Sequence, residues 1–184
     1  MKATEILKSE HRVIERVIGA MEAEVARLEA GQEIDPAFFI QAADFIKGFA
    51  DGCHHRKEEG VLFKAMAARG LSEEAGPIAV MLAEHEMGRK YTRGMREAAQ
   101  RYQDGDLSAR DQIIQNALGY ASLLRQHIQK EDLILFPMAD RVIPMGEQER
   151  VADDFEQVEH DETGEGVHEK YLALAERLEG IAVG

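Results

Sequence analysis

The chain has 184 residues, 45% of them hydrophobic and 31% charged, which is typical of one folded domain and excludes a disordered tail. Its formal net charge of −13 disfavours nucleic acid and anionic membranes as partners, because both attract clustered Lys and Arg. No apolar stretch approaches the roughly 18 residues that span a bilayer, and the N-terminus is charged where a signal peptide is apolar, so we expect a cytoplasmic protein.

Apolar residues recur at helical spacing in five stretches, and no stretch alternates as a half-buried strand would. The pattern predicts an all-α protein. The second stretch starts with Asp35 and Pro36, a carboxylate cap followed by a proline that suits a first helical turn. Four long helices are therefore expected, over about residues 4–30, 35–70, 76–102 and 109–137.

After a loop at 144–146, the chain carries a fifth helical stretch that Gly164 and Gly166 interrupt. Short loops between long helices favour antiparallel neighbours. We thus expect an antiparallel up-and-down four-helix bundle over residues 1–143, built from two helix pairs. An additional C-terminal helix is expected in an extension, residues 144–184, that packs on the same domain.

Two ten-residue segments, 54–63 and 127–136, share one pattern: His, two variable residues, Lys, Glu, an acidic residue, a variable residue, a β-branched residue, Leu and Phe. They start 73 residues apart, and a Glu-His pair at 10–11 recurs 74 residues later at 84–85. This internal repeat indicates two copies of one helix pair, each with a His followed by a His and a Glu one turn apart.

Residues four apart on a helix lie on the same face, so His54 can reach one ion together with Glu58, and His127 together with Glu131. Carboxylates facing a core are costly unless a cation joins them. Antiparallel packing brings the two repeats together, which predicts a site for two metal ions. The candidate ligands are His11, His54, Glu58, His85, His127 and Glu131.

The chemistry of these ligands favours iron. Cys53 is the one cysteine, which excludes sites made of several thiolates and leaves nitrogen and oxygen ligands. Carboxylates suit oxidised iron and imidazoles suit iron, copper or zinc, so iron leads and manganese and zinc follow. Two ions that share both glutamates would keep positions for an oxo or hydroxo bridge and for an outside ligand.

At these residues the sequence resembles the hemerythrin-like HHE cation-binding family, whose pattern is His, HxxxE, His and HxxxE on successive helices. The resemblance covers roughly residues 10–137 and includes the segments CHHRKEEGVLF and QHIQKEDLILFP. It implies a non-haem di-iron centre that binds oxygen or a similar small molecule, with Glu58 and Glu131 as bridges. Oxygen-carrying hemerythrins have a second histidine one turn from the ligand on the third helix, where this chain has Met81 and Arg89.

The sequence supports more than one function for such a centre. The first is a protein that binds or senses oxygen, nitric oxide or peroxide. The alternatives are an enzyme that reduces nitric oxide or peroxide or oxidises ferrous iron, an iron donor for the repair of iron–sulfur clusters, and a purely structural bundle. The sequence leaves the choice among these and the oligomeric state open.

Three further residues lie near the pattern. His55 is rotated by roughly 100° from His54 around an α-helix, so it is expected to face a neighbouring helix or solvent, with support of a ligand as its best functional role. His160 in the fifth stretch is a candidate additional ligand or a support for one. Tyr120, two turns before His127, is a candidate donor to a metal-bound oxygen, although core packing is the commoner role for such an aromatic residue.

Overall fold

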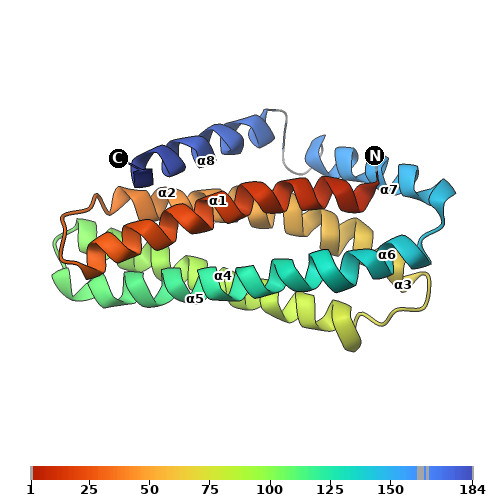
Figure 1. Ribbon diagram of the computed structural model, residues 1–184, viewed down its shortest axis with the longest axis horizontal. Coiled ribbons are helices and arrows are strands. Elements are labelled where there is room, and N and C mark those ends of the chain that lie inside the picture. Colours follow the sequence, from red (N-terminus) through yellow and green to blue (C-terminus); the bar gives the residue numbers. More distant parts are fainter. Residues whose placement is uncertain (1, 161–163, 165, 184) are drawn as a thin grey trace.

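The computed structural model describes residues 2–160, 164 and 166–183, and every regular element in these ranges is helical (Figure 1). The first rod is α1 (Ala3–Glu29). The second rod is a continuous helical run of α2, two π-helical segments and α3: α2 (Ala37–Phe45), η1 (Ile46–His55), η2 (Glu58–Leu62) and α3 (Phe63–Ala67).

The other two rods follow the same order, first an uninterrupted α-helix and then a rod that contains a π-helical segment. The third rod is α4 (Gly76–Gln103), and the short 3-10 turn η3 (Leu107–Ala109) leads out of it. The fourth rod comprises α5 (Arg110–Lys130), the π-helical η4 (Glu131–Leu135) and α6 (Phe136–Val142).

Successive rods run in opposite directions (Figure 1). Helix α1 packs against α5, α5 against α4, and α4 against α2, which closes a bundle around one interior. The predicted all-α, up-and-down four-helix bundle is therefore confirmed. Its second rod begins at Ala37, with Pro36 rather than Asp35 at the N-cap position, and Asp35 Oδ1 accepts a hydrogen bond of 2.9 Å from the backbone N–H of Ala37.

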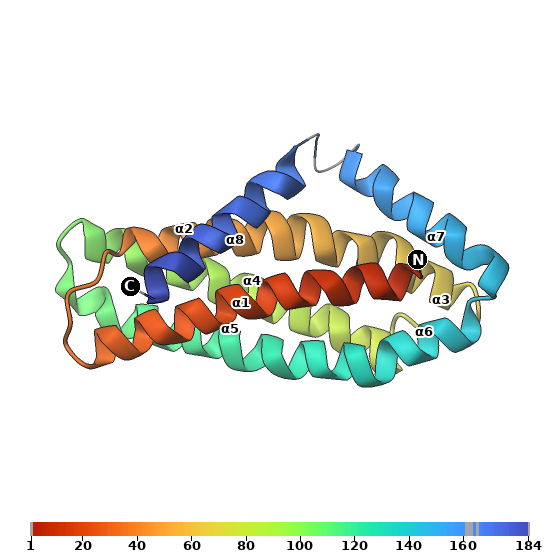
Figure 2. The same cartoon turned by 45° about the horizontal axis from the view of Figure 1, so that its top comes forward.

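The C-terminal extension forms two helices where the sequence predicted one, α7 (Met145–Val158) and α8 (Val167–Val183). Gly164 and Gly166 both adopt positive φ, of 97° and 76°, a left-handed conformation that glycine tolerates and a helix does not. Both glycines lie between α7 and α8, which run in different directions (Figure 2).

The extension packs on the bundle through apolar side chains of both helices. Val151 and Phe155 of α7 join a cluster at one end of the molecule, and Leu174 and Leu178 of α8 join a cluster at the other end. Helix α8 lies along α1 and α2, and α7 contacts α1 and η2. Both helices lie on one side of the bundle in Figure 2.

A polar layer separates these two apolar clusters. On α1, for example, Leu7 belongs to one cluster and Ile14 to the other, with the fully buried His11 between them. The second, third and fourth rods contribute to the same layer. Its other members are His54, His55, Glu58, His85, His127 and Glu131.

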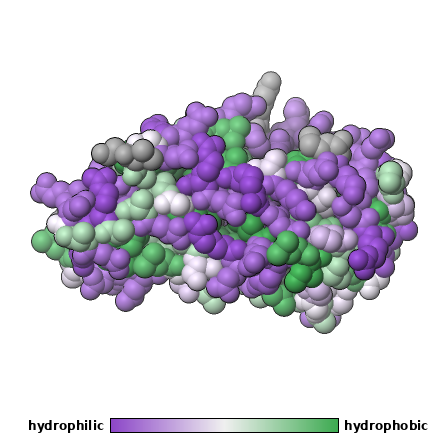
Figure 3. Space-filling view, viewed as in Figure 1, coloured by the Kyte–Doolittle hydropathy of each residue, from purple (hydrophilic) through white to green (hydrophobic). Residues whose placement is uncertain are grey.

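The surface differs sharply from this interior. Polar side chains cover most of the face drawn in Figure 3. None of the described helices combines the length and the apolar character needed to cross a bilayer.

Gly48 of η1 offers a test of how α8 docks. A Cβ at Gly48 would lie well inside van der Waals distance of the Tyr171 ring on α8. We expect Gly48→Ala to lower the free energy of unfolding by about 1–3 kcal/mol, the usual cost of overpacking, measured by urea denaturation.

Gly19 of α1 is the matched control, because a Cβ there meets no atom within 4 Å. Gly19→Ala should raise the free energy of unfolding by about 0.5–1 kcal/mol, through the lower entropy of the unfolded chain. Equal effects of the two substitutions would contradict the docking of Tyr171 on Gly48.

Candidate metal centre

The π-helical segments of the bundle carry most of the polar layer. His54 and His55 end η1, Glu58 begins η2, and Glu131 begins η4. A π-turn is wider than an α-turn, so neighbouring residues are separated by a smaller angle around the axis. Adjacent side chains such as His54 and His55 can therefore both face the interior.

The structure brings all six candidate ligands together, and His55 joins them. They form two groups whose potential ligand atoms lie within 4.8 Å of one another, all of them on buried residues. The three-histidine group consists of His55, Glu58, His85 and His127. The two-histidine group consists of His11, His54, Glu58 and Glu131.

Each glutamate turns one oxygen toward each group. Oε1 of Glu58 lies 3.5 Å from His54 Nε2, and its Oε2 lies 3.4 Å from His85 Nε2. Glu131 does the same, with Oε2 at 3.1 Å and Oε1 at 3.1 Å from the Nε2 atoms of its two neighbours, His11 and His127. Both carboxylates thus lie where they can bridge two cations.

The inward atoms of this layer fit a metal. Buried polar atoms normally have hydrogen-bond partners, because desolvating them unpaired is costly. Imidazole nitrogen together with carboxylate oxygen is a donor set that iron, manganese and zinc accept. In the described part of the chain, the buried atoms without a hydrogen bond include Nε2 of His11, His54 and His55 and both carboxylate oxygens of Glu58 and Glu131.

The outward nitrogen of every histidine in the layer is held by a carboxylate. Such a contact fixes Nδ1 as the protonated nitrogen and leaves the lone pair of Nε2 for the interior. The five contacts, with their Nδ1–oxygen distances, are His11–Asp132 (2.8 Å), His54–Glu10 (2.9 Å), His55–Asp51 (3.0 Å), His85–Glu59 (2.7 Å) and His127–Glu84 (2.9 Å).

Comparison with known proteins agrees with this geometry. The model of the family described as the hemerythrin HHE cation binding domain matches residues 2–139, most of the chain. The chain belongs to this family. The resemblance of the sequence to HHE domains is thereby confirmed, and the buried His/Glu groups of this HHE domain are suitable for a di-metal site.

Curated relatives of this HHE domain are described as uncharacterized proteins. Three proteins, from Mycobacterium bovis and two strains of Mycobacterium tuberculosis, are 28% identical to it over 167 residues. The matched region covers 89% of this chain and 63% of each relative, so the chain spans less than two thirds of their length. No solved structure matches the chain.

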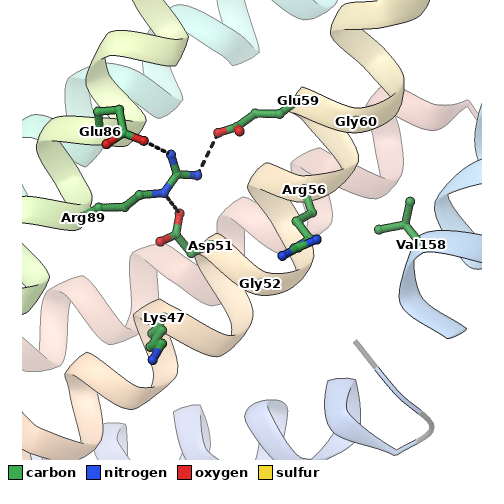
Figure 4. A pocket seen from close by; sticks show the side chains of 9 residues that line it. All are labelled: Lys47, Asp51, Gly52, Arg56, Glu59, Gly60, Glu86, Arg89 and Val158. Carbon is green, nitrogen blue, oxygen red and sulfur yellow. Dashed lines mark hydrogen bonds and ion pairs between the residues drawn. The ribbon is translucent and has the colours of Figure 1, made fainter. Parts of the chain in front are cut away.

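The carboxylates that hold the histidines of the HHE domain are in turn contacted by cationic side chains. Arg89 connects two of them, because its Nε donates to Asp51 Oδ1 at 2.9 Å and its NH2 group to Glu59 Oε1 at 2.8 Å (Figure 4). It also donates to Glu86, at 2.6 Å, beside a cavity of about 700 Å³. The other cations in such contacts are Arg12 on Asp132, Lys57 on Glu10 and Lys130 on Glu84.

The sequence missed His55 as a member of the centre. This residue is only 3% exposed, and its ring stacks on His85 with centroids 3.8 Å apart. Burial first, and then the neighbouring charges, lower the pKa of His55 well below its ordinary value, so the imidazole is neutral, the form that binds metal. The signal in the sequence was Asp51, which lies one turn before His55 as a carboxylate partner would.

Two other residues named from the sequence, His160 and Tyr120, lie outside the two groups of potential ligands. His160 is exposed just beyond the end of α7, and it belongs to neither the three-histidine nor the two-histidine group, so its role as a ligand or support stays a prediction. Tyr120 is buried in the core, and its hydroxyl has no hydrogen-bond partner among the described residues. Burial, and secondarily the charge of Asp51, raises the pKa of Tyr120.

Protons compete with metal in this HHE domain. Burial by itself lowers the pKa of His11, but the carboxylates of Asp132 and Glu131 outweigh it and raise the pKa to about 9. Burial likewise opposes the carboxylates around His127, which raise its pKa to about 10. These shifts favour the protonated form of both imidazoles when metal is absent.

This leads to a prediction for the metal-free protein. A folded-state pKa above the ordinary value of 6.5 gives stability that is complete below pH 6.5 and is lost as the pH rises through the folded-state pKa. We expect the free energy of unfolding to fall as the pH is raised through about 9 and 10, measured by urea denaturation in the presence of a chelator.

Metal affinity should change in the opposite direction. Binding displaces the protons of His11 and His127, so affinity should rise with pH over the same range, and a calorimetric titration should detect proton release. His11→Gln should reduce both slopes. An unfolding free energy that rises between pH 7 and the folded-state values would contradict the charge assignment.

Proposed function

We propose that this HHE domain holds two iron ions and binds or senses oxygen, nitric oxide or peroxide at one of them. The observation that carries the proposal is an unequal supply of imidazoles around two shared carboxylates. Three histidines face one side of the Glu58 and Glu131 pair, and two face the other. The two ions would therefore differ in how many positions the protein fills.

The difference assigns the place of an outside ligand. Iron prefers about six donors, and non-haem iron proteins that bind small molecules leave one or more of these positions open. With both carboxylates shared, the ion at the three-histidine group would have one more protein donor than the ion at the two-histidine group. An oxygen bridge would occupy one position on each, so the two-histidine group, with His11 and His54, is where a small molecule would bind.

The surrounding residues support binding rather than simple storage of metal. Apolar clusters lie on both sides of the polar layer and exclude water from it. The carboxylates on Nδ1 orient each imidazole and raise its basicity, which strengthens the bond of Nε2 to a metal. When bound, iron would supply the reducible centre to which oxygen, nitric oxide or peroxide attaches.

This chain lacks the second histidine that oxygen-carrying hemerythrins have on the third helix, and His55 and Arg89 together account for this difference. In oxygen carriers of this family that histidine lies one turn from the ligand, where this chain has Met81 and Arg89; Arg89 cannot act as a ligand. It instead fixes Asp51, the carboxylate that holds His55. We infer that His55, from the second rod, replaces the imidazole that the third rod lacks, so that simple oxygen carriage remains compatible with the site.

The alternative of an enzyme needs a proton donor beside the open position. The two donors suggested by the sequence are poorly suited, because His160 is exposed and the raised pKa of Tyr120 makes its hydroxyl a weak acid. We therefore rank binding or sensing above turnover, and above donation of iron to iron–sulfur clusters, for which the site offers no specific support.

The iron content tests the proposal directly. After anaerobic reconstitution we expect two ferrous ions per chain, measured by elemental analysis, and one molecule of nitric oxide per pair, measured by optical titration. Metal that binds only the native state at 100 times its Kd should stabilise the fold by about 2.7 kcal/mol per site. A chain that binds no iron and melts at the same temperature with and without it would overturn the proposal.

Variants test the assignment of ligands. Glu58→Ala should reduce the content of both ions, since one oxygen faces each group, whereas His55→Ala should weaken mainly one ion, by roughly 10-fold or more. His160→Ala is the control and should keep two ions. If His55→Ala behaves like this control in competition titrations, His55 is no ligand; if His160→Ala loses iron like Glu58→Ala, the ligand set extends into the extension.

A further inference from the structure

Both repeats extend a histidine of the centre outward through a carboxylate to a lysine. In the first repeat, Nδ1 of His54 lies 2.9 Å from Oε2 of Glu10, and Lys57 donates a hydrogen bond to the other oxygen of Glu10. The second repeat forms the same chain, with the same 2.9 Å contact, from His127, Glu84 and Lys130.

The two hydrogen-bonded series, each of a histidine, a glutamate and a lysine, differ beyond the lysine. The side chain of Lys130 is 37% exposed, and its one ion pair within the described ranges is with Glu84. The side chain of Lys57 is fully buried, at 0% exposure, and it pairs with a second carboxylate, that of Glu159. The internal repeat is therefore symmetric up to the lysine and asymmetric beyond it.

Glu159 belongs to the extension and not to the matched HHE region. It directly follows α7, beyond residue 139, where the family match ends. His168 of α8 lies near the same oxygen of Glu159, with Nδ1 3.6 Å from Oε1, and the His168 ring lies 5.2 Å from that of Phe49 in η1. Residues from α8 and from the end of α7 thus meet where the hydrogen-bonded series of the first repeat ends, at Lys57.

This place is not a third metal site. Glu10, Glu159 and His168 come close enough together to hold a cation. The ammonium group of Lys57, however, already bonds to both carboxylates and supplies the positive charge that they need. The group is better understood as a connection between the extension and the centre.

The connection has an electrostatic consequence for His54. Glu10 accepts a hydrogen bond from Nδ1 and makes the imidazole a stronger donor to a metal. Lys57 withdraws part of the negative charge of Glu10, and Glu159 shares Lys57, which leaves more of that charge facing His54. A stronger donor favours the more highly charged, ferric state.

We propose that Glu159 is a positioning residue through which the C-terminal extension tunes the iron held by His11 and His54. The inference rests on the proposed function, because it needs iron at the two-histidine group. Coupling between two sites is reciprocal. If docking of Glu159 on Lys57 favours ferric iron, ferric iron favours docking of α7 and α8, so the extension reports the state of the centre.

The experiment compares two neutralised acids, one in the last turn of α7 and one directly after it. Glu159→Gln removes the carboxylate that bonds Lys57, and Glu156→Gln removes the same charge from an exposed position one turn earlier. Both variants are made in the full chain, and the iron content of each is measured first. We expect Glu159→Gln, and not Glu156→Gln, to raise the reduction potential of the centre in spectroelectrochemical titration.

Hydrogen exchange provides the second readout. In the wild-type protein, the amides of α7 and α8 should exchange more slowly in the ferric than in the ferrous state, and Glu159→Gln should abolish the difference. In metal-free protein the same variant should already loosen the end of α7, whereas Glu156→Gln should not. Glu159→Asp, which keeps the charge, should restore a large part of the wild-type behaviour.

The outcomes separate this inference from the proposed function. A wild-type chain without iron would overturn the proposed function and, with it, the coupling. Two ions per chain in all variants, combined with equal potentials for Glu159→Gln and the wild type, would overturn the coupling alone. Equal shifts in Glu159→Gln and Glu156→Gln would also overturn it, because net charge rather than the Lys57 contact would then be the cause.

Discussion

The structure depends on one electrostatic constraint, the burial of two carboxylates inside an apolar bundle. Glu58 and Glu131 are fully buried, and their four oxygens have no hydrogen-bond partner among the described residues. Such groups cost several kcal/mol each unless cations neutralise them. The imidazoles that surround them provide protons when metal is absent and donor nitrogens when it is present, so the same residues satisfy the constraint in either state.

That constraint extends outward in layers. Each imidazole that faces the centre needs an acceptor for its outer nitrogen, and each acceptor is a carboxylate that needs a cation in turn. Arg89 satisfies two of these carboxylates at once, those of Asp51 and Glu59, because its planar group carries several N–H donors. The acidic composition of the chain is thus partly structural, because several of its carboxylates are committed to orienting histidines.

The internal repeat makes the centre nearly symmetric, and two departures from this symmetry distinguish its two sides. His55 has no counterpart in the second repeat, where the equivalent residue is Ile128. This one difference makes the imidazoles unequal on the two sides of the glutamates. The extension adds the second difference through Glu159, since Lys57 becomes buried while Lys130 stays partly exposed. Both differences distinguish the three-histidine group from the two-histidine group.

The sequence by itself determined the fold class, the four rods, the internal repeat and six residues of the polar layer, because helical periodicity and i, i+4 spacing place a residue on one face of its own helix. Only the tertiary structure decided the place of His55, because its inward direction depends on the π-helical turn of η1. The same holds for the carboxylate partners: Glu10 meets His54, and Asp132 meets His11, across rods. Periodicity along one helix does not specify which atoms of other helices meet it, and packing alone brought Glu159 to Lys57.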